Sequence, residues 1–117
     1  KTLNDNFGHA LGDLVLQTIT ETCMKTLRKT DTIARWGGDE FMIMMPETDH
    51  CHASVIAERI RQKTFNRFHG RDFNVTLSIG ITVSREEDKN LDDIYARADK
   101  ALYKAKANGK NRTEKVL

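Results

Sequence analysis

The spacing of apolar side chains predicts three amphipathic helices. In residues 10–29 apolar positions recur at intervals of three or four, which places them on one face of a helix. A second stripe follows Thr48-Asp49, and a third runs over 91–105 before an Asn-Gly stop signal at 108–109. The three stripes are Leu16, Ile19, Cys23 and Leu27; Ala53, Ile56, Ala57 and Ile60; and Leu91, Ile94, Tyr95, Ala98, Ala101, Leu102 and Ala105.

Strands are predicted between these helices. Residues 32–36 and 41–45 flank two glycines, which indicates a β-hairpin, and the second of these strands is apolar on both faces, as central strands are. Residues 75–83 alternate apolar and polar side chains and predict a half-buried strand. A polar loop is expected over 65–72, and a short edge strand over 115–117.

Helices that alternate with strands, with one hairpin among them, favour an α/β domain (an α+β sandwich) with a mixed or mainly antiparallel central sheet flanked by helices. A length of 117 residues fits one domain, which we assign to residues 1–117.

Composition limits the functional classes. The formal charge is +2, from 19 basic and 17 acidic residues, so the net charge does not indicate a nucleic-acid partner. The spacing of Cys23 and Cys51 is not that of a zinc site, and Cys23 is best interpreted as a small buried apolar residue. No apolar run approaches the roughly 20 residues of a spanning helix. We therefore expect a soluble, cytoplasmic domain, whose full-length parent can still be anchored to a membrane through other segments.

The most informative stretch is residues 37–41, Gly-Gly-Asp-Glu-Phe, at the predicted hairpin turn. Glycine at this position either permits a tight turn or lets a ligand approach the backbone closely. Two adjacent carboxylates repel each other unless a cation is bound beside them. A solvated acidic turn is the alternative interpretation, but the pattern favours metal or metal-phosphate chemistry.

These five residues form the signature of the diguanylate cyclase family, which the chain resembles along nearly its whole length. Two further blocks occur in the family's order. They are Lys1-Thr2-Leu3-Asn4-Asp5 with Gly8-His9 and Gly12-Asp13, and Ala98-Asp99-Lys100-Ala101-Leu102-Tyr103-Lys104-Ala105-Lys106 with Gly109-Lys110-Asn111. The resemblance implies a palm-like fold, shared with polymerases and adenylyl cyclases.

The resemblance also implies a reaction. Two GTP molecules condense to cyclic di-GMP, each 3′-hydroxyl attacking the α-phosphate of the other nucleotide and releasing pyrophosphate. Asp39 is then a ligand of Mg²⁺ (or Mn²⁺) that helps to deprotonate the hydroxyl, and Glu40 supports the metal site. Mg²⁺ commonly takes one or two carboxylates and keeps water and phosphate as its other ligands. Because each domain holds one GTP, the resemblance implies a homodimer.

Substrate-binding residues follow from the matched blocks. Asp13 and Asn4 correspond to the residues that recognise guanine, and Gly37 and Gly38 let the nucleotide lie against the turn. Without the family resemblance, Asn4 would be interpreted as a helix cap and Asp13 as an acidic residue in the first turn of a helix. The resemblance assigns the terminal phosphates to two lysines that would otherwise complement the helix dipole, Lys106 and Lys110.

An inhibitory product site is also implied. Arg28-Lys29-Thr30-Asp31 reads RxxD, and five residues separate it from Gly37, as in members that bind cyclic di-GMP there. Arg59 resembles a second arginine of that site. Taken alone, Arg28 and Asp31 form an ordinary solvated pair.

Members of the family carry, just before the position of Lys1, a strand with a metal-binding aspartate. That segment is absent from this sequence, so we expect a domain truncated at its N-terminus, without its first strand and with poor turnover as a fragment. We also expect an upstream sensory or regulatory domain. Two other functions stay open: a non-catalytic sensor of GTP or cyclic di-GMP, and a dimerisation module that binds no guanine nucleotide.

Overall fold

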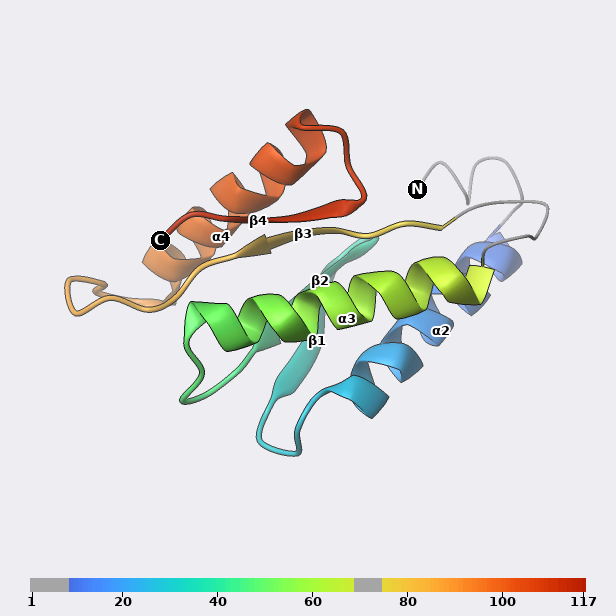
Figure 1. Ribbon diagram of the computed structural model, residues 1–117, viewed down its shortest axis with the longest axis horizontal. Coiled ribbons are helices and arrows are strands. Elements are labelled where there is room, and N and C mark those ends of the chain that lie inside the picture. Colours follow the sequence, from blue (N-terminus) through green and yellow to red (C-terminus); the bar gives the residue numbers. More distant parts are fainter. Residues whose placement is uncertain (1–8, 69–74) are drawn as a thin grey trace. The chain divides into compact units, whose positions relative to one another are not determined.

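The computed structural model describes residues 9–68 and 75–117, which belong to two compact units (Figure 1). The first, residues 1–47, is called the hairpin unit. The second, residues 48–117, is called the parallel-strand unit. Helices and strands occur in both units, which confirms the expected mixed α/β composition. Asn4 and part of the loop expected over 65–72 lie outside the described residues.

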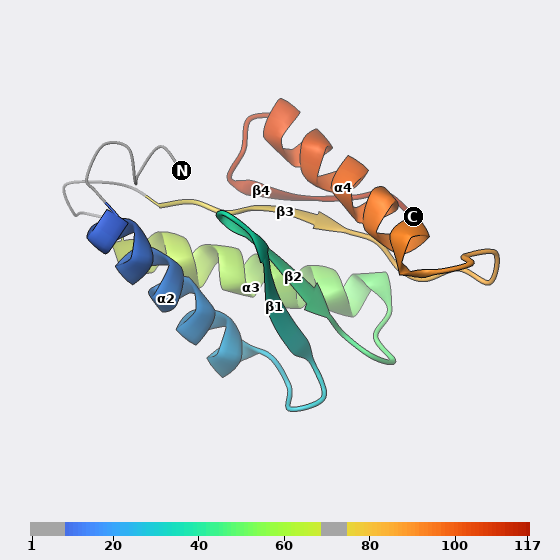
Figure 2. The same cartoon turned by 180° about the vertical axis from the view of Figure 1, so that it is seen from behind.

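The hairpin unit contains helix α2 (His9–Thr26) followed by strands β1 (Thr32–Gly37) and β2 (Glu40–Met44). Along α2 the buried apolar side chains are Val15, Ile19 and Cys23, spaced by four residues. The helix contacts β1 (Figure 2). Leu16, which the predicted stripe placed in the core, is only half-buried. The interpretation of Cys23 is confirmed: it is 3% exposed, and burial raises the pKa of its thiol to about 11.

Helix α2 ends at Thr26, three residues before the predicted end. The cause is a turn in which the carboxylate of Asp31 accepts from the backbone N–H of Arg28 at 2.8 Å. The N–H of Asp31 in turn donates to the carbonyl of Arg28 at 3.0 Å. An aspartate that satisfies local backbone groups in this way competes with helix continuation.

Strands β1 and β2 form the predicted antiparallel hairpin. The register pairs Thr32 with Met44 and Arg35 with Phe41, and then shifts so that Gly37 pairs with Glu40. Trp36 is thus an extra residue at a bulge, a feature that twists the end of a hairpin. The expected central position of β2 is not found among the described residues, because β2 hydrogen-bonds only to β1.

The parallel-strand unit contains α3 (His50–Phe68), β3 (Ser78–Ile81), α4 (Leu91–Ala107) and β4 (Arg112–Lys115). Strands β3 and β4 are parallel, and α4 is the crossover helix that parallel neighbours require. Their register runs from Ser78 opposite Arg112 to Ile81 opposite Lys115. The predicted strand over 75–83 is therefore shorter, and the edge strand expected over 115–117 begins three residues earlier.

The helices of this unit follow the predicted stripes, with one extension. Helix α4 begins after Asn90, whose side chain accepts from the N–H of Asp93, and ends before Asn108, as predicted. Helix α3 continues through residues 65–68, which were expected in a loop, because Thr64 and Phe68 prolong its buried face. Within the described residues, no helix is long and apolar enough to cross a membrane.

Candidate functional site

The glycine-acid turn joins the two strands of the hairpin. Gly38 has a positive φ of 31° and forms the turn with Asp39, which is exposed, whereas Glu40 is half-buried at the start of β2. The bulge at Trp36 breaks the regular alternation just before this turn. The two carboxylates are therefore adjacent in sequence but occupy different backbone environments.

Arg35 holds this turn from the preceding strand. Its Nε and Nη2 atoms donate to the carbonyl oxygen of Gly38 at 3.0 and 2.7 Å. A guanidinium fork on one carbonyl fixes the backbone more firmly than a single bond. The sequence predictions did not include Arg35. The available signal was its position two residues before a glycine pair, from which a long side chain can reach the turn.

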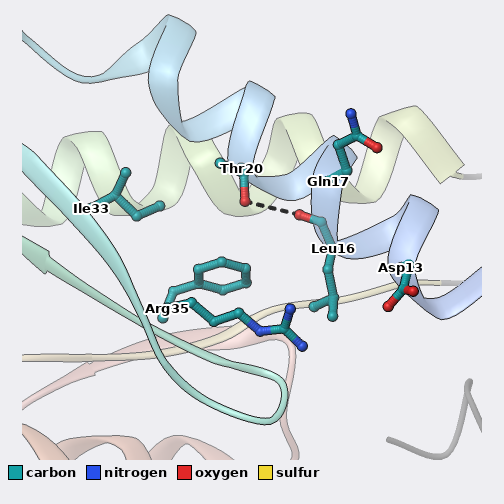
Figure 3. A pocket seen from close by; sticks show the side chains of 7 residues that line it. Asp13, Leu16, Gln17, Thr20, Ile33 and Arg35 are labelled. Carbon is teal, nitrogen blue, oxygen red and sulfur yellow. Dashed lines mark hydrogen bonds between the residues drawn. The ribbon is translucent and has the colours of Figure 1, made fainter. Parts of the chain in front are cut away.

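A cavity of about 380 Å³ lies between α2 and the hairpin (Figure 3). This volume is within the range of small-molecule sites. Asp13 contributes a carboxylate from the helix side, and Arg35 contributes its guanidinium from the hairpin side. The remaining lining residues are Leu16, Gln17, Thr20, Ile33 and Phe41. The cavity thus combines apolar walls with charged groups of both signs, an arrangement that suits a planar polar ring.

Threonine side chains of α2, including one that lines the cavity, form hydrogen bonds to the backbone of the same helix. The hydroxyl of Thr20 donates to the carbonyl of Leu16 at 3.0 Å, the bond drawn in Figure 3. Thr18, Thr22 and Thr26 make the same bond to the residue four positions earlier. Such bonds satisfy each hydroxyl within the helix. The carboxylate of Asp13, which is exposed, is the charged group that this helix contributes to the cavity lining.

The metal-ligating capacity of the described residues is limited. No group of three or more His, Cys, Asp or Glu side chains within residues 9–68 and 75–117 is placed to hold a metal ion. Asp39 and Glu40 are a pair of oxygen donors, which fits a hard divalent cation that keeps water and phosphate as further ligands. The donor set thus fits Mg²⁺ or Mn²⁺ better than zinc.

The predicted inhibitory residues Arg28 and Asp31 are brought together. Nη2 of Arg28 lies 3.0 Å from Oδ1 of Asp31 and also donates to the carbonyl of Pro46 at 2.9 Å. The hydrogen bond from Arg28 holds the pKa of Asp31 below its ordinary value, and the same bond raises the pKa of Arg28. Asp31 has no exposed side-chain surface, whereas Arg28 is about half exposed. The guanidinium is therefore the accessible part of the pair.

The remaining predicted site residues belong to the parallel-strand unit. Arg59 is exposed on α3 and lines a cavity of about 440 Å³ together with Ser54, Val55, Glu58 and Gln62. Lys106 is exposed in the last turn of α4, and Lys110 is exposed just beyond its end. Gly109, with φ of 122°, and Lys110 donate to the carbonyls of Lys106 and Ala105, which closes the helix with a Schellman motif.

Comparison with known proteins decides the family. Residues 1–112 match the model of the diguanylate cyclase GGDEF domain. The chain belongs to the GGDEF family. Residues 37–41 are its signature, and the palm-like α+β fold expected from the sequence is confirmed.

Relatives of this GGDEF domain include proteins named as diguanylate cyclases. It is 41% identical over 115 residues to diguanylate cyclase A of Treponema denticola, covering 96% of this chain and 31% of that protein. The active GGEEF domain of a Vibrio cholerae diguanylate cyclase superposes with a TM-score of 0.83 at 35% identity, covering 99% of this chain and 75% of that one. The GGDEF domain of DgcB from Caulobacter crescentus, solved with c-di-GMP, superposes with a TM-score of 0.79 at 30% identity. The match covers 97% of this chain and 70% of that one. The chain thus spans less than a third of the Treponema relative.

Proposed function

We propose that this GGDEF domain is the catalytic domain of a diguanylate cyclase. The observation that carries the proposal is the cavity of the hairpin unit, where Asp13 from α2 and Arg35 beside the GGDEF turn line one space. A purine fits its volume, and the Vibrio relative supports the activity. The substrates are two GTP molecules and the products are cyclic di-GMP and two pyrophosphates.

Asp13 is the residue that recognises guanine in this proposal. The Watson–Crick edge of guanine offers two adjacent donors, N1–H and the 2-amino group, and one carboxylate can accept from both. Asn4 is the proposed second contact. Adenine offers no such donor pair, so it would leave these polar groups unpaired, which is the strongest basis for rejecting a ligand.

The transfer step needs positioning more than covalent participation by the protein. The 3′-oxygen of one nucleotide bonds to the α-phosphorus of the other, the bond from that phosphorus to the pyrophosphate oxygen breaks, and the hydroxyl proton passes to a base, for which Asp39 is the candidate. Gly37 and Gly38 let the nucleotide approach the turn, and Lys106 and Lys110 bind the terminal phosphates. Asp39 and Glu40 would hold Mg²⁺ or Mn²⁺, which supplies charge neutralisation and lowers the pKa of the attacking hydroxyl. Two domains must face each other, so the active species is a homodimer.

The deciding experiment incubates the full-length protein with GTP and Mg²⁺ and quantifies cyclic di-GMP by chromatography. Wild type should form product, and Asp39→Ala should lose at least about a hundredfold in rate, because it removes the proposed metal ligand. Glu47→Ala, which alters an acid outside the turn, is the matched control. Equal rates for Asp39→Ala and wild type would contradict the metal assignment.

A product-inhibition site at Arg28 and Asp31 is the second part of the proposal. The half-exposed guanidinium of Arg28 can stack on a guanine and donate to it, while Asp31 keeps that guanidinium in position. Arg59 is the proposed second contact. Arg28→Ala should leave the initial rate similar and remove inhibition by added cyclic di-GMP, whereas Lys29→Ala, its exposed neighbour, should not. An unchanged inhibition curve for Arg28→Ala would remove this site.

The same residues permit a non-catalytic sensor. That function predicts binding of GTP or cyclic di-GMP without product formation. Titration calorimetry beside the rate assay separates the alternatives, since a dimerisation module would bind neither nucleotide.

A further inference from the structure

The segment that carries Lys110 has an unusual backbone. Lys110 and Asn111 have φ angles of 63° and 46°, in the left-handed region. Few residues other than glycine adopt this conformation, and two in succession persist only where neighbouring groups hold them. Contacts from other residues of the same unit hold this pair.

Arg61 on α3 makes one of these contacts. Its Nη1 atom donates to Oδ1 of Asn111 at 2.8 Å, across 50 positions of sequence. Its Nε and Nη2 atoms bind the two carboxylate oxygens of Glu58 at 2.9 and 2.8 Å. The Arg61 side chain is only 17% exposed and that of Glu58 is 42% exposed, so the guanidinium is the more enclosed partner of the pair. The bonds that Arg61 and Glu58 form raise the pKa of the guanidinium and lower the pKa of the carboxyl.

Two further contacts fix the same segment. The hydroxyl of Thr113 donates to Oε2 of Glu58, so α3 holds the chain both at Asn111 and two residues later. Nε of Arg112 donates to the carbonyl of Lys110 at 3.2 Å. The backbone around Lys110 is therefore held by a network of side-chain bonds, in which Arg61 makes the bond to Asn111.

We propose that Arg61 is a positioning residue for triphosphate binding: through Asn111 it holds the backbone from which Lys110 reaches the terminal phosphates. The inference rests on the proposed function, because it needs Lys110 to bind phosphate. Arg61 does not bind the phosphates itself, since its charge is already neutralised by Glu58 in a bidentate pair. Its effect on the ligand should therefore pass entirely through Lys110.

The test measures affinity for two ligands by titration calorimetry with the full-length protein. One is 3′-deoxy-GTP, which lacks the attacking hydroxyl, and the other is GMP, which lacks the terminal phosphates. Arg61→Gln should weaken 3′-deoxy-GTP binding about three- to tenfold, the range for the net contribution of an ordinary hydrogen bond, and should leave GMP binding unchanged. Asn111→Gly, which keeps the left-handed backbone but removes the acceptor, should do the same.

A double-mutant cycle tests the route through Lys110. Lys110→Gln should weaken 3′-deoxy-GTP binding about tenfold. Adding Arg61→Gln should cause no further loss of affinity, because the effects of two residues that act through one contact are not additive. Arg97→Gln is the matched control: it removes another enclosed arginine of the same unit, 11% exposed and paired with Asp88, and should not alter triphosphate affinity. Thermal unfolding of each variant confirms that it is folded.

Three results would overturn the inference alone: unchanged triphosphate affinity in Arg61→Gln, equal weakening of both ligands, or effects of Arg61→Gln and Lys110→Gln that multiply. Failure of the proposed function looks different. In that case wild type itself would bind neither 3′-deoxy-GTP nor GMP, or would bind them but form no cyclic di-GMP from GTP.

Discussion

Individual glycines of this domain serve opposite purposes. A Cβ atom on Gly80 would lie 2.3 Å from the backbone nitrogen of Leu102 and 2.6 Å from the carbonyl oxygen of Ala98. A Cβ atom on Gly37 would meet nothing within 4 Å. Gly80 therefore permits α4 to pack directly on β3, whereas the space beside Gly37 is open to a ligand.

This difference predicts a separation of stability from activity. Gly80→Ala should lower the free energy of unfolding by about 3 kcal/mol, because backbone of α4 cannot yield to the added methyl group. Gly37→Ala should change it by no more than about 0.5 kcal/mol, as for an open surface position. Yet Gly37→Ala should lower GTP turnover about tenfold or more by displacing the nucleotide. Urea denaturation and the rate assay give the two quantities, and a stable Gly80→Ala would show that β3 and α4 can separate at little cost.

The bond between Arg35 and the turn leads to a prediction for the hairpin. Arg35→Lys keeps the positive charge but replaces a two-point contact on the Gly38 carbonyl with at most one donor. We expect turnover to fall about tenfold, because the acids of the turn are then less precisely placed.

The exposed Arg67 provides the control, and Arg67→Lys should retain full turnover. Circular dichroism establishes that both proteins are folded. Wild-type kinetics in Arg35→Lys would show that the hairpin needs no such support.

At the level of elements, Arg97 connects α4 to the loop before it by an ion pair and to the residues after β3 by hydrogen bonds. Arg97 donates to both oxygens of Asp88, at 2.9 and 2.8 Å, and also to the hydroxyl of Thr82 and the carbonyl of Val83. Hydrogen bonds from Arg97 lower the pKa of Asp88 to about 2. The pair thus connects the loop before α4 to the helix and to the residues that follow β3.

The lowered pKa fixes the sign of a pH effect. A carboxyl whose folded pKa is below its ordinary value of 3.8 stabilises the fold above that value, and this contribution disappears as the pH falls through about 2. Asp88→Asn should therefore lower the unfolding temperature near neutral pH. On acidification, the unfolding temperature of this variant should fall less than that of wild type.

The control is Asp92→Asn, in the first turn of α4, which should follow the wild-type profile more closely. Thermal unfolding followed from about pH 6 to about pH 2 makes the comparison. Parallel curves for wild type and Asp88→Asn would contradict the assignment.

Elements were predictable from sequence where local spacing determines them. The periodicity around Ile19 and Ala101 identified α2 and α4, and the glycine pair identified the hairpin. The parallel ladder of β3 and β4 was not predicted, because residues such as Thr113 pair with partners more than thirty positions away and carry no local signal. The early end of α2 depended on Asp31, whose competition with the helix is visible only in three dimensions.

The candidate site shows the same limit. The family motif located Asp39 and Asp13, but pattern alone did not show that Asp13 lines one cavity with Arg35. Arg35 and Arg61 were missed, since arginines on the surface and arginines that hold a backbone look alike in sequence. Bond geometry distinguishes Arg35, and bond geometry together with low exposure distinguishes Arg61.

On the scale of the whole molecule, the proposed chemistry requires symmetry. Cyclic di-GMP contains two identical linkages, and the domain has a single GGDEF turn, so two copies related by a twofold axis would each supply one half-site. A defective copy should therefore disable its partner as well. This consequence separates an obligate dimer from subunits that work alone.

Mixing experiments measure that consequence. Full-length wild type and Asp39→Ala protein, combined in equal amounts and allowed to exchange subunits, should give about a quarter of the activity of the same total amount of wild type, because random pairing leaves about a quarter of the twofold dimers with two intact half-sites. Independent subunits would give about half. Arg67→Lys mixed with wild type in the same ratio should retain full activity, which controls for losses during exchange. A value near one half would exclude the symmetric mechanism, since a chain that completes the reaction without an intact partner needs no second GGDEF turn.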